Sequence, residues 1–428
     1  MGDGPLDGSP RRGLATATFG FFIGLGVVVL YGPAAEEFNR AMGLSGVLLG
    51  LLVAAPNLIG SLLRIPFGAW ADDVGPKKPF VLLLSLSAVG MAGLSTILLV
   101  WYPDGLTLRL YPAVFLFGAL SGCGIGVFPV GSAQTSYWYP LERQGTALAV
   151  YGGLGNSAPG VFTILVPVAL ATVGLTATYL AWFAFVAVGT LVYALLAADP
   201  YYFQLRDRGD APDRARKRAR ELGQELFPNG STFDSVKEAA RLPRSWALVG
   251  LYFVSFGGFL ALTVWFPTYW TVFHGLNTRS AGLITAVGFV FLSTVVRMSG
   301  GVASDHIGGE TASIAGFGVI GAGSIFLIVS GNPAHAAIGM TLLAAGIGLA
   351  NAAVFQLLPH YVPRAVGGAA GLVGGIGAFG GFVIPPIFGL FVDLQGLAGY
   401  ANGFVVYLLL GVAGVVLSVH LSAVVDRG

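Results

Sequence analysis

The sequence predicts an all-α membrane protein with twelve transmembrane helices in two pseudo-symmetric halves of six. Of its 428 residues, 55% are hydrophobic and 10% are charged, and the mean hydropathy is +0.79. Apolar runs of about 20 residues recur along the chain, and such a run is long enough to cross a bilayer. Residues 198–245 form the one long polar connection between these runs. One charged motif is repeated on either side of that connection.

The first span follows the polar residues 1–13, and its apolar run is too long for a signal-peptide core, so we expect this span to be retained. Short connections separate the later spans. Three regions are expected: an N-terminal six-helix half at 1–197, a cytoplasmic basic linker at 198–245 and a C-terminal six-helix half at 246–428. The expected spans are about 14–35, 44–70, 79–101, 109–136, 145–170, 175–197, 246–271, 280–303, 311–331, 334–358, 365–392 and 399–422.

Positive residues predict the orientation. If the N-terminus is cytoplasmic, the inner segments hold seventeen of the 22 Lys and Arg. Because cytoplasmic loops are enriched in these residues, we expect both termini in the cytoplasm and the chain in the inner (plasma) membrane. In the linker, Asp213 lies four residues before Lys217, which favours a short basic helix. That helix would lie on the anionic inner leaflet, bind a partner, or simply connect the halves in solvent.

Arg64 stands in the middle of the second span. Eight residues separate it from Asp72 at the helix end, which places it about 12 Å inside the membrane edge and near the midplane. A guanidinium there costs about 2.5–3.5 kcal/mol and keeps its proton. An anion or a water-filled cavity must therefore meet Arg64.

The same arrangement recurs in the eighth span. Arg297, Gly301 and Asp305 each lie 233 positions after Arg64, Gly68 and Asp72. The chain is therefore an internal duplication, and each half contributes one midplane arginine.

Two such arginines favour a small planar oxyanion as ligand. A guanidinium presents coplanar N–H donors that fit a trigonal oxyanion, and two facing guanidinium groups repel until an anion lies between them. The alternative for each arginine is a structural pair with a buried acid, but no Asp or Glu lies in the middle of any expected span. We therefore interpret Arg64 and Arg297 as substrate ligands.

A second motif, GAWADDVGPKK, follows the second span, and a partial copy, GVASDHIGG, follows the eighth span. An acid at a helix end can hold basic residues or the N-terminus of a neighbouring helix across the inner face, and glycine allows close approach. We expect a conformational latch here rather than an ordinary polar turn. This pattern resembles the signature loop of the major facilitator superfamily, whose two halves rock around a central site. The latch residues are Gly68, Asp72, Gly75, Lys77, Lys78, Gly301 and Asp305.

Three further segments narrow the resemblance. The runs LLRIPFGAWAD, GGLGNSAPG and GLVGGIGAFGGFVIP, in the second, fifth and eleventh spans, are similar to the nitrate/nitrite porter family. The resemblance implies nitrate and nitrite as substrates. It also implies Tyr252 as a hydroxyl donor and Asn156 as an amide near the anion. Further implied contacts are the backbone of Gly152 and the aromatic walls Phe128, Phe256 and, less directly, Phe22. Any one phenylalanine could instead face lipid or pack in the core.

Glycines line the fifth and eleventh spans at the small-residue spacing that lets helix backbones touch. We expect them to form sliding surfaces, to serve close packing, or both. They are Gly153, Gly155 and Gly160, followed by Gly371, Gly374, Gly375, Gly377 and Gly381.

The expected transport mode is exchange of nitrate against nitrite. Permanently charged arginines carry no proton, and the carboxylates and histidines lie at span ends or in loops. Proton-coupled nitrate symport and transport of formate, oxalate or another small anion remain open alternatives. An anion sensor is a further alternative, whereas an enzyme is disfavoured because the spans lack clustered His, Asp or Glu. Cys123 is the single cysteine, and we expect no cofactor, no metal, no nucleic-acid partner and a monomer in the bilayer.

Overall fold

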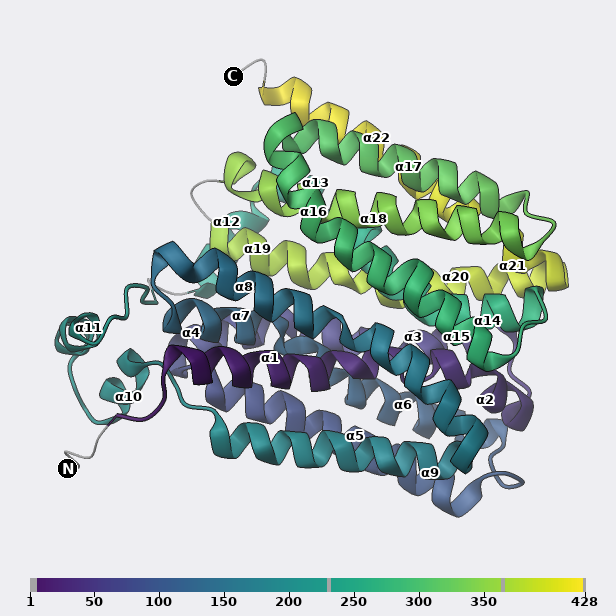
Figure 1. The fold of residues 1–428 in the computed structure, drawn as a ribbon, viewed down its shortest axis with the longest axis horizontal. Helices are drawn as coiled ribbons and strands as arrows, with labels where there is room; N and C mark the ends of the chain where they lie inside the picture. The colour runs from purple at the N-terminus through teal and green to yellow at the C-terminus, as the bar shows by residue number, and fades with distance from the viewer. Residues whose placement is uncertain (1–5, 229–231, 363–365, 426–428) are drawn as a thin grey trace.

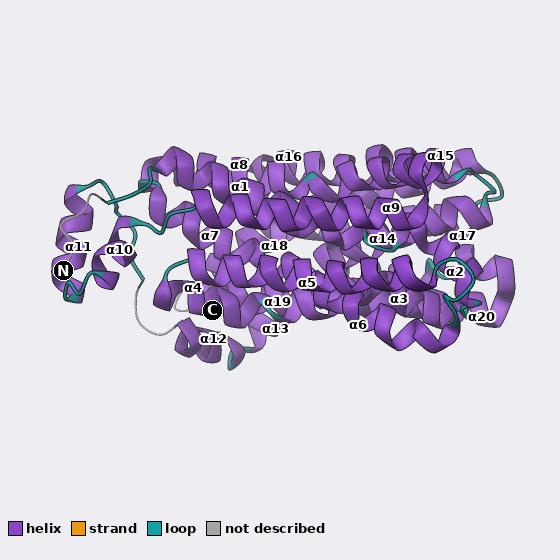
Figure 2. Ribbon diagram, turned by 90° about the horizontal axis from the view of Figure 1, so that it is seen from below, coloured by secondary structure: helices purple, strands orange, loops and turns teal. Residues whose placement is uncertain are grey.

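The computed structural model describes residues 6–228, 232–362 and 366–425. These residues form a bundle of long helices without a strand, which confirms the all-α prediction (Figure 2). The first group of helices comprises α1 (Pro10–Gly26), α2 (Ala35–Met42), α3 (Gly46–Leu62), α4 (Arg64–Val74), α5 (Lys77–Trp101), α6 (Tyr111–Ser121), α7 (Val127–Trp138), α8 (Leu141–Asn156) and α9 (Ala158–Leu196).

Three shorter helices follow and lead into the second group. The shorter helices are α10 (Tyr201–Asp207), α11 (Pro212–Glu221) and α12 (Thr232–Ala240). The second group comprises α13 (Pro243–Tyr252), α14 (Gly258–Thr268), α15 (Thr278–Thr285), α16 (Leu292–Ile307), α17 (Gly309–Ile328), α18 (Pro333–Tyr361), α19 (Val366–Ile376), α20 (Gly380–Gln395), α21 (Gly399–Asn402) and α22 (Val405–Val425).

Eleven apolar helical segments in the described ranges are long enough to cross a membrane, and one of them makes two crossings. The segment Leu141–Leu196 has 56 residues, which would measure about 84 Å if straight. Inside it, Gly174 has φ of 80° and breaks the helix between the fifth and sixth expected spans. A residue with a side chain rarely adopts this φ, so glycine allows the reversal. The prediction of twelve crossings is confirmed.

The two groups of helices lie side by side in Figure 1, with α1–α9 below and α13–α22 above. The start of α1, the end of α22 and the helices α10–α12 all lie at the left end of the bundle. We call this the inner end, following the orientation that the charges predict, and the opposite end the outer end. The division into an N-terminal half, a linker and a C-terminal half remains a prediction.

The two groups are in close contact near the outer end. The Asp393 carboxylate of α20 accepts hydrogen bonds from the backbone N–H groups of Gly46 (2.5 Å) and Val47 (2.9 Å) at the start of α3. A carboxylate at a helix N-terminus satisfies free N–H groups and complements the helix dipole. A Cβ on Gly46 would lie only 2.3 Å from the backbone oxygen of Gly389, so the backbones touch directly. This contact closes the outer end.

We expect Asp393→Asn to loosen this closure, because the amide keeps the shape but loses the charge. Loss of such a cap costs about 0.5–2 kcal/mol, which shifts the population toward an outward-open form by about two- to thirtyfold. Spin labels on cysteines at Arg40 and Leu397 would report the distance across the outer end, because the native Cys123 is buried. Asp104→Asn, in an exposed outer loop, is the control. Unchanged distance distributions in Asp393→Asn would show that the cap does not hold the two groups together.

Candidate functional site

Arg64 lies at a break in the second span. The second span is divided at Leu63 into α3 and α4, and Arg64 is the first residue of α4. Its side chain is 2% exposed, and its Nη1 donates to the carbonyl of Gly374 at 3.2 Å. Its Nε and Nη2 are buried without a hydrogen-bond partner. A buried guanidinium with free donors is costly unless a ligand accepts from it.

Arg297 extends from α16 toward the same aromatic ring as Arg64. The guanidinium carbons of Arg64 and Arg297 lie 5.0 Å and 5.9 Å from the ring centre of Phe256, and Arg64 also lies 5.4 Å from Phe128. All three separations fit cation–π contacts. The two arginines, from different groups of helices, therefore meet around Phe256.

Both arginines line one cavity of about 700 Å³. The lining continues from the arginines to Asp72 and Ser136 near the inner ends of α4 and α7, and α12 contributes Val236. The cavity therefore reaches from the middle of the bundle toward its inner end. Other residues of its wall are Gly68, Phe128, Ser132, Tyr151, Gly152, Gly153, Asn156, Thr294, Met298, Phe355, Gly371 and Gly374.

Within the described residues, no acidic side chain forms an ion pair with either arginine. The nearest acid along the chain to Arg64 is Asp72, two turns away, and its carboxylate accepts a hydrogen bond from the Tyr137 hydroxyl at 2.6 Å. Among the described residues, the positive charges in the middle of the bundle are therefore not neutralised by an acidic side chain.

Tyr252 and Phe256 lie at an irregular point of the seventh span. The π-helical turn Phe253–Gly257 follows α13, and such turns often occur at functional sites. Tyr252 stacks on Phe256 with ring centres 5.1 Å apart, and its buried hydroxyl lies close to the Arg297 guanidinium, which can donate a hydrogen bond to it. Tyr252 therefore lies behind the aromatic wall rather than on the surface of the large cavity.

Asn156 and Gly152 both line the cavity, one turn apart on α8. The Asn156 amide nitrogen donates to the Gly152 carbonyl at 2.7 Å, and the amide oxygen is buried without a partner. A Cβ on Gly152 would meet nothing within 4 Å, so the backbone is open to the cavity.

Phe22 is absent from the residues that line the cavity, and its ring packs 6.1 Å from that of Phe162. The neighbouring Phe21 instead contacts Phe128 and Tyr151, with ring centres 5.3 and 5.0 Å apart. The first span therefore supports the aromatic wall through Phe21.

The sequence interpretation missed three residues in the cavity region. Tyr151 lines the cavity and its hydroxyl donates to the Phe128 carbonyl at 2.8 Å. Phe355 of α18 lines it as well, and Asn351, one turn away on the same helix, is buried. Tyr151 and Asn351 could have been found by the rule that singles out polar residues inside spans.

Comparison with known proteins agrees with this arrangement. The family model described as the Major Facilitator Superfamily matches residues 13–385. A protein of Mycobacterium tuberculosis (strain ATCC 25618 / H37Rv) named "Probable nitrate/nitrite transporter NarK2" is 30% identical, over 90% of this chain and 88% of its own. This chain belongs to the major facilitator superfamily, in the nitrate/nitrite porter family. This major facilitator protein is thus a transporter and a multi-pass membrane protein.

Other relatives of this major facilitator protein cover similar lengths. The "Probable nitrate/nitrite antiporter NarK1" of Thermus thermophilus is 28% identical over 94% of this chain and 89% of its own. The "Nitrite extrusion protein" of Bacillus subtilis (strain 168) is 28% identical over 94% and 92%. Among solved structures, the xylose transporter XylE from E. coli shares the fold with a TM-score of 0.73 and 16% identity, over 95% of this chain and 96% of that one.

The residues predicted to form a latch lie at the inner end of the transporter. Gly68 and Asp72 line the inner part of the cavity, and the Nζ of Lys78 lies 3.4 Å from Asp207 at an exposed position. A Cβ on Gly301 would meet nothing within 4 Å, and the Asp305 side chain lies outside the described residues. The latch function stays a prediction.

The glycines of the fifth and eleventh spans face different neighbours. On α8 and α9, a Cβ on Gly153 or Gly160 would approach Met298 or Phe291 of the other group, whereas one on Gly155 would meet Phe21. In the eleventh span, Gly371 and Gly374 line the cavity, Gly375 and Gly381 face the second span, and Gly377 faces Tyr252. Each span therefore packs across the boundary between the groups. Whether these surfaces slide stays a prediction.

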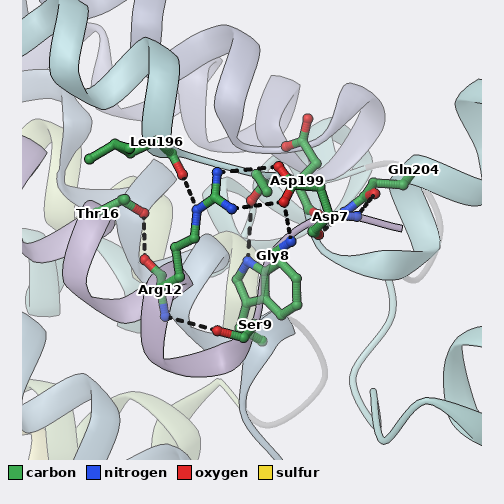
Figure 3. A network of polar contacts seen from close by, with 10 residues as sticks. Asp7, Gly8, Ser9, Arg12, Thr16, Leu196, Asp199 and Gln204 are labelled. Carbon is green, nitrogen blue, oxygen red and sulfur yellow. Dashed lines mark hydrogen bonds and ion pairs between the residues drawn. The ribbon is translucent and has the colours of Figure 1, made fainter. Parts of the chain in front are cut away.

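Gly75 and Lys77 of the transporter contact Asp199, a residue that the sequence did not single out. The Lys77 backbone N–H donates to the Asp199 carboxylate at 2.8 Å, and the Asp199 carbonyl accepts from Gln204 at 2.6 Å. Gly75 has φ of 89° and packs against the carboxylate. Figure 3 shows Asp199 beside an adjoining network in which Asp7 pairs with Arg12 at 2.7 Å.

Burial raises the pKa of the Asp199 carboxyl to about 6. The usual value is about 4, so the folded protein binds a proton here between about pH 4 and 6 that the unfolded chain releases. This group therefore stabilises the fold as pH falls through 6 and leaves a destabilising charge above it. We expect Asp199→Asn, which keeps an acceptor for Lys77, to raise the melting temperature relative to wild type more at pH 8 than at pH 4.5. An equal difference at both pH values would contradict this, and the control is Asp73→Asn, which removes an exposed carboxylate near the end of α4.

Proposed function

We propose that this transporter carries nitrate and nitrite across the plasma membrane by alternating access, with Arg64 and Arg297 as the central anion ligands and both termini in the cytoplasm. The names of its relatives and the chemistry of the cavity support the proposal. Seventeen of the 22 Lys and Arg fall in segments at the inner side under this orientation.

One observation carries the proposal: two arginines from different groups of helices line one cavity without an ion pair among the described residues. An anion between them would accept the free donors of Arg64 and remove the repulsion between the two charges. The rings of Phe128 and Phe256 lie against the guanidinium groups. Flat aromatic faces would accommodate planar nitrate or nitrite and disfavour tetrahedral sulfate or phosphate.

The transport cycle follows from the same charges. With the site empty, the arginines repel, and bringing the two groups together around the midplane is unfavourable. With an anion bound, the repulsion is neutralised and residues 1–197 and 246–428 rock as units. The Asp393 cap would hold the outer end closed in the inward-facing state. The predicted latch at the end of α4, which contains Asp72, would hold the inner end closed in the other state.

Exchange is the proposed mode because an empty site resists this movement. Proton-coupled symport would need a titratable group that binds and releases a proton together with the anion. No Asp or Glu lies in the middle of a span. Because nitrate and nitrite are similar in shape, one site can bind both. The proposed exchange is therefore nitrate entry against nitrite exit.

The substrate can be tested with purified protein in lipid vesicles. We expect labelled nitrate uptake into vesicles loaded with nitrite, competition by external nitrate and nitrite, and little competition by sulfate or phosphate. Stronger competition by formate or oxalate would identify a carrier of small carboxylates. Binding without any flux would indicate a membrane sensor and would refute transport.

A further inference from the structure

A second, much smaller space lies beside Arg297 and apart from the large cavity. Its volume is about 10 Å³. Three residues line both this space and the large cavity: Asn156, Thr294 and Arg297. Ser293 and Phe259 also line it, and both lie one helical turn outward from the anion site. The remaining polar wall is Asn351 of α18. We call this space the outer chamber.

Two amide oxygens at the outer chamber have no hydrogen-bond partner. The Asn156 amide nitrogen donates to the Gly152 carbonyl at 2.7 Å, which leaves the Asn156 oxygen buried and unpaired. Asn351 is 3% exposed, and its amide oxygen is also buried and unpaired. A buried acceptor left without a donor costs about 1–3 kcal/mol, so two of them at one small space call for a ligand that donates.

The chemistry of the outer chamber selects that ligand. An oxyanion has no hydrogen to donate and would face two carbonyl oxygens. A metal cation would face the fixed positive charge of Arg297, which repels it. A water molecule has two O–H donors for the two amide oxygens and a lone pair for a guanidinium N–H. About 10–15 Å³ of such space holds one water, and buried waters make about three hydrogen bonds.

We propose that the outer chamber binds one water molecule that donates to Asn156 and Asn351 and accepts from Arg297, and that Asn351 is thereby a positioning residue for the anion site. The water links α8 in one group of helices with α16 and α18 in the other. It holds the Arg297 guanidinium in its place beside Phe256, in the orientation in which its remaining donors face the anion. Asn351 itself does not touch the anion.

This inference rests on the proposed anion transport and makes its own prediction for the kinetics. Asn351→Leu keeps the branched shape of the side chain but replaces the amide by two methyl groups, which cannot accept a hydrogen bond, so the water lacks one acceptor and Arg297 is held less firmly. We expect the KM for nitrate to rise about tenfold, the effect of losing one hydrogen bond worth about 1.4 kcal/mol, and Vmax to stay within about twofold. Asn351→Ser keeps a hydrogen-bonding group next to the water and should restore KM to within about threefold of wild type.

The experiment measures nitrate exchange in vesicles for wild type, Asn351→Leu, Asn351→Ser and the control Thr341→Val. Thr341 lies on α18 at an exposed position, and its hydroxyl bonds only the Ala337 carbonyl in the same helix. Melting temperatures show whether each variant is folded, and an experimental structure of the wild type at a resolution that shows waters reports the chamber directly.

A water within hydrogen-bonding distance of both amides, together with the KM rise in Asn351→Leu and its recovery in Asn351→Ser, would support the inference. A wild-type KM in Asn351→Leu, equal losses in the leucine and serine variants, or a chamber without water would overturn it. A wild type that carries no nitrate at all would instead refute the proposed function, so the two failures are distinguishable.

Discussion

Arg64→Lys is expected to reduce nitrate uptake at low nitrate concentration by at least about thirtyfold. Lysine keeps the positive charge, but its ammonium cannot present two coplanar donors to a trigonal oxyanion. One lost hydrogen bond to a charged group costs about 1.5–3 kcal/mol, which corresponds to about ten- to 150-fold. The ammonium would also give up the contacts of the guanidinium with the rings of Phe128 and Phe256. Initial uptake rates in vesicles measure the loss.

Arg297→Lys should cause a loss of the same order, because the two arginines share one anion. Arg279→Lys is the matched control, since this arginine is exposed at the start of α15, at the outer end, and its replacement should leave uptake unchanged. Melting temperatures within a few degrees of wild type would exclude misfolding. If either site variant transports nitrate like wild type, that arginine is not a substrate ligand and the two-arginine proposal falls.

The fold was predictable because membrane crossing depends on length and polarity, which the sequence displays directly. Every expected span corresponds to a helical segment, and the one merged segment is broken at Gly174, between expected spans that end at 170 and begin at 175. The convergence of Arg64 and Arg297 was predictable for a related reason. An arginine at the midplane must face the interior of the bundle, and the repeat places both at the same depth.

The faces of apolar helices could not be predicted in the same way. A span that is apolar all round has no moment that tells which side faces the cavity. Phe21 and Phe22 are adjacent and equally apolar, and about 100° of helix rotation separates them. Only the packing shows that Phe21 contacts Phe128 while Phe22 packs against Phe162.

Long-range polar contacts were also beyond the sequence. Asp393 is recognisable as an acid at a span end, but its partners at Gly46 and Val47 lie in the other group of helices. Asp199 looks like a solvated residue after a span, and only folding buries it against Gly75 and Lys77. Pairings of this kind depend on which loops meet, and hydropathy carries no information about that.

Nitrate uptake is expected to depend on an anion inside the vesicle. In vesicles loaded with nitrite or nitrate, uptake should exceed that into anion-free vesicles by at least about tenfold, because the return step needs an anion between Arg64 and Arg297. Without one, the two arginines repel each other; any two unit charges about 5 Å apart repel by about 3 kcal/mol at an effective dielectric constant of 20, and a barrier of that size slows a step about a hundredfold. Chloride-loaded vesicles serve as the control for volume and ionic strength.

A proton gradient should not replace the internal anion. Arginine remains protonated across the accessible pH range, so an inwardly directed proton gradient cannot neutralise the positive charge of the empty site. If acid outside drives strong nitrate uptake into anion-free vesicles, a proton must bind during the cycle, and symport would replace exchange. In that case Asp72, the acid on the cavity wall at its inner part, would be the first residue to examine. Loss of the pH-driven uptake in Asp72→Asn, with nitrite exchange retained, would locate the proton there.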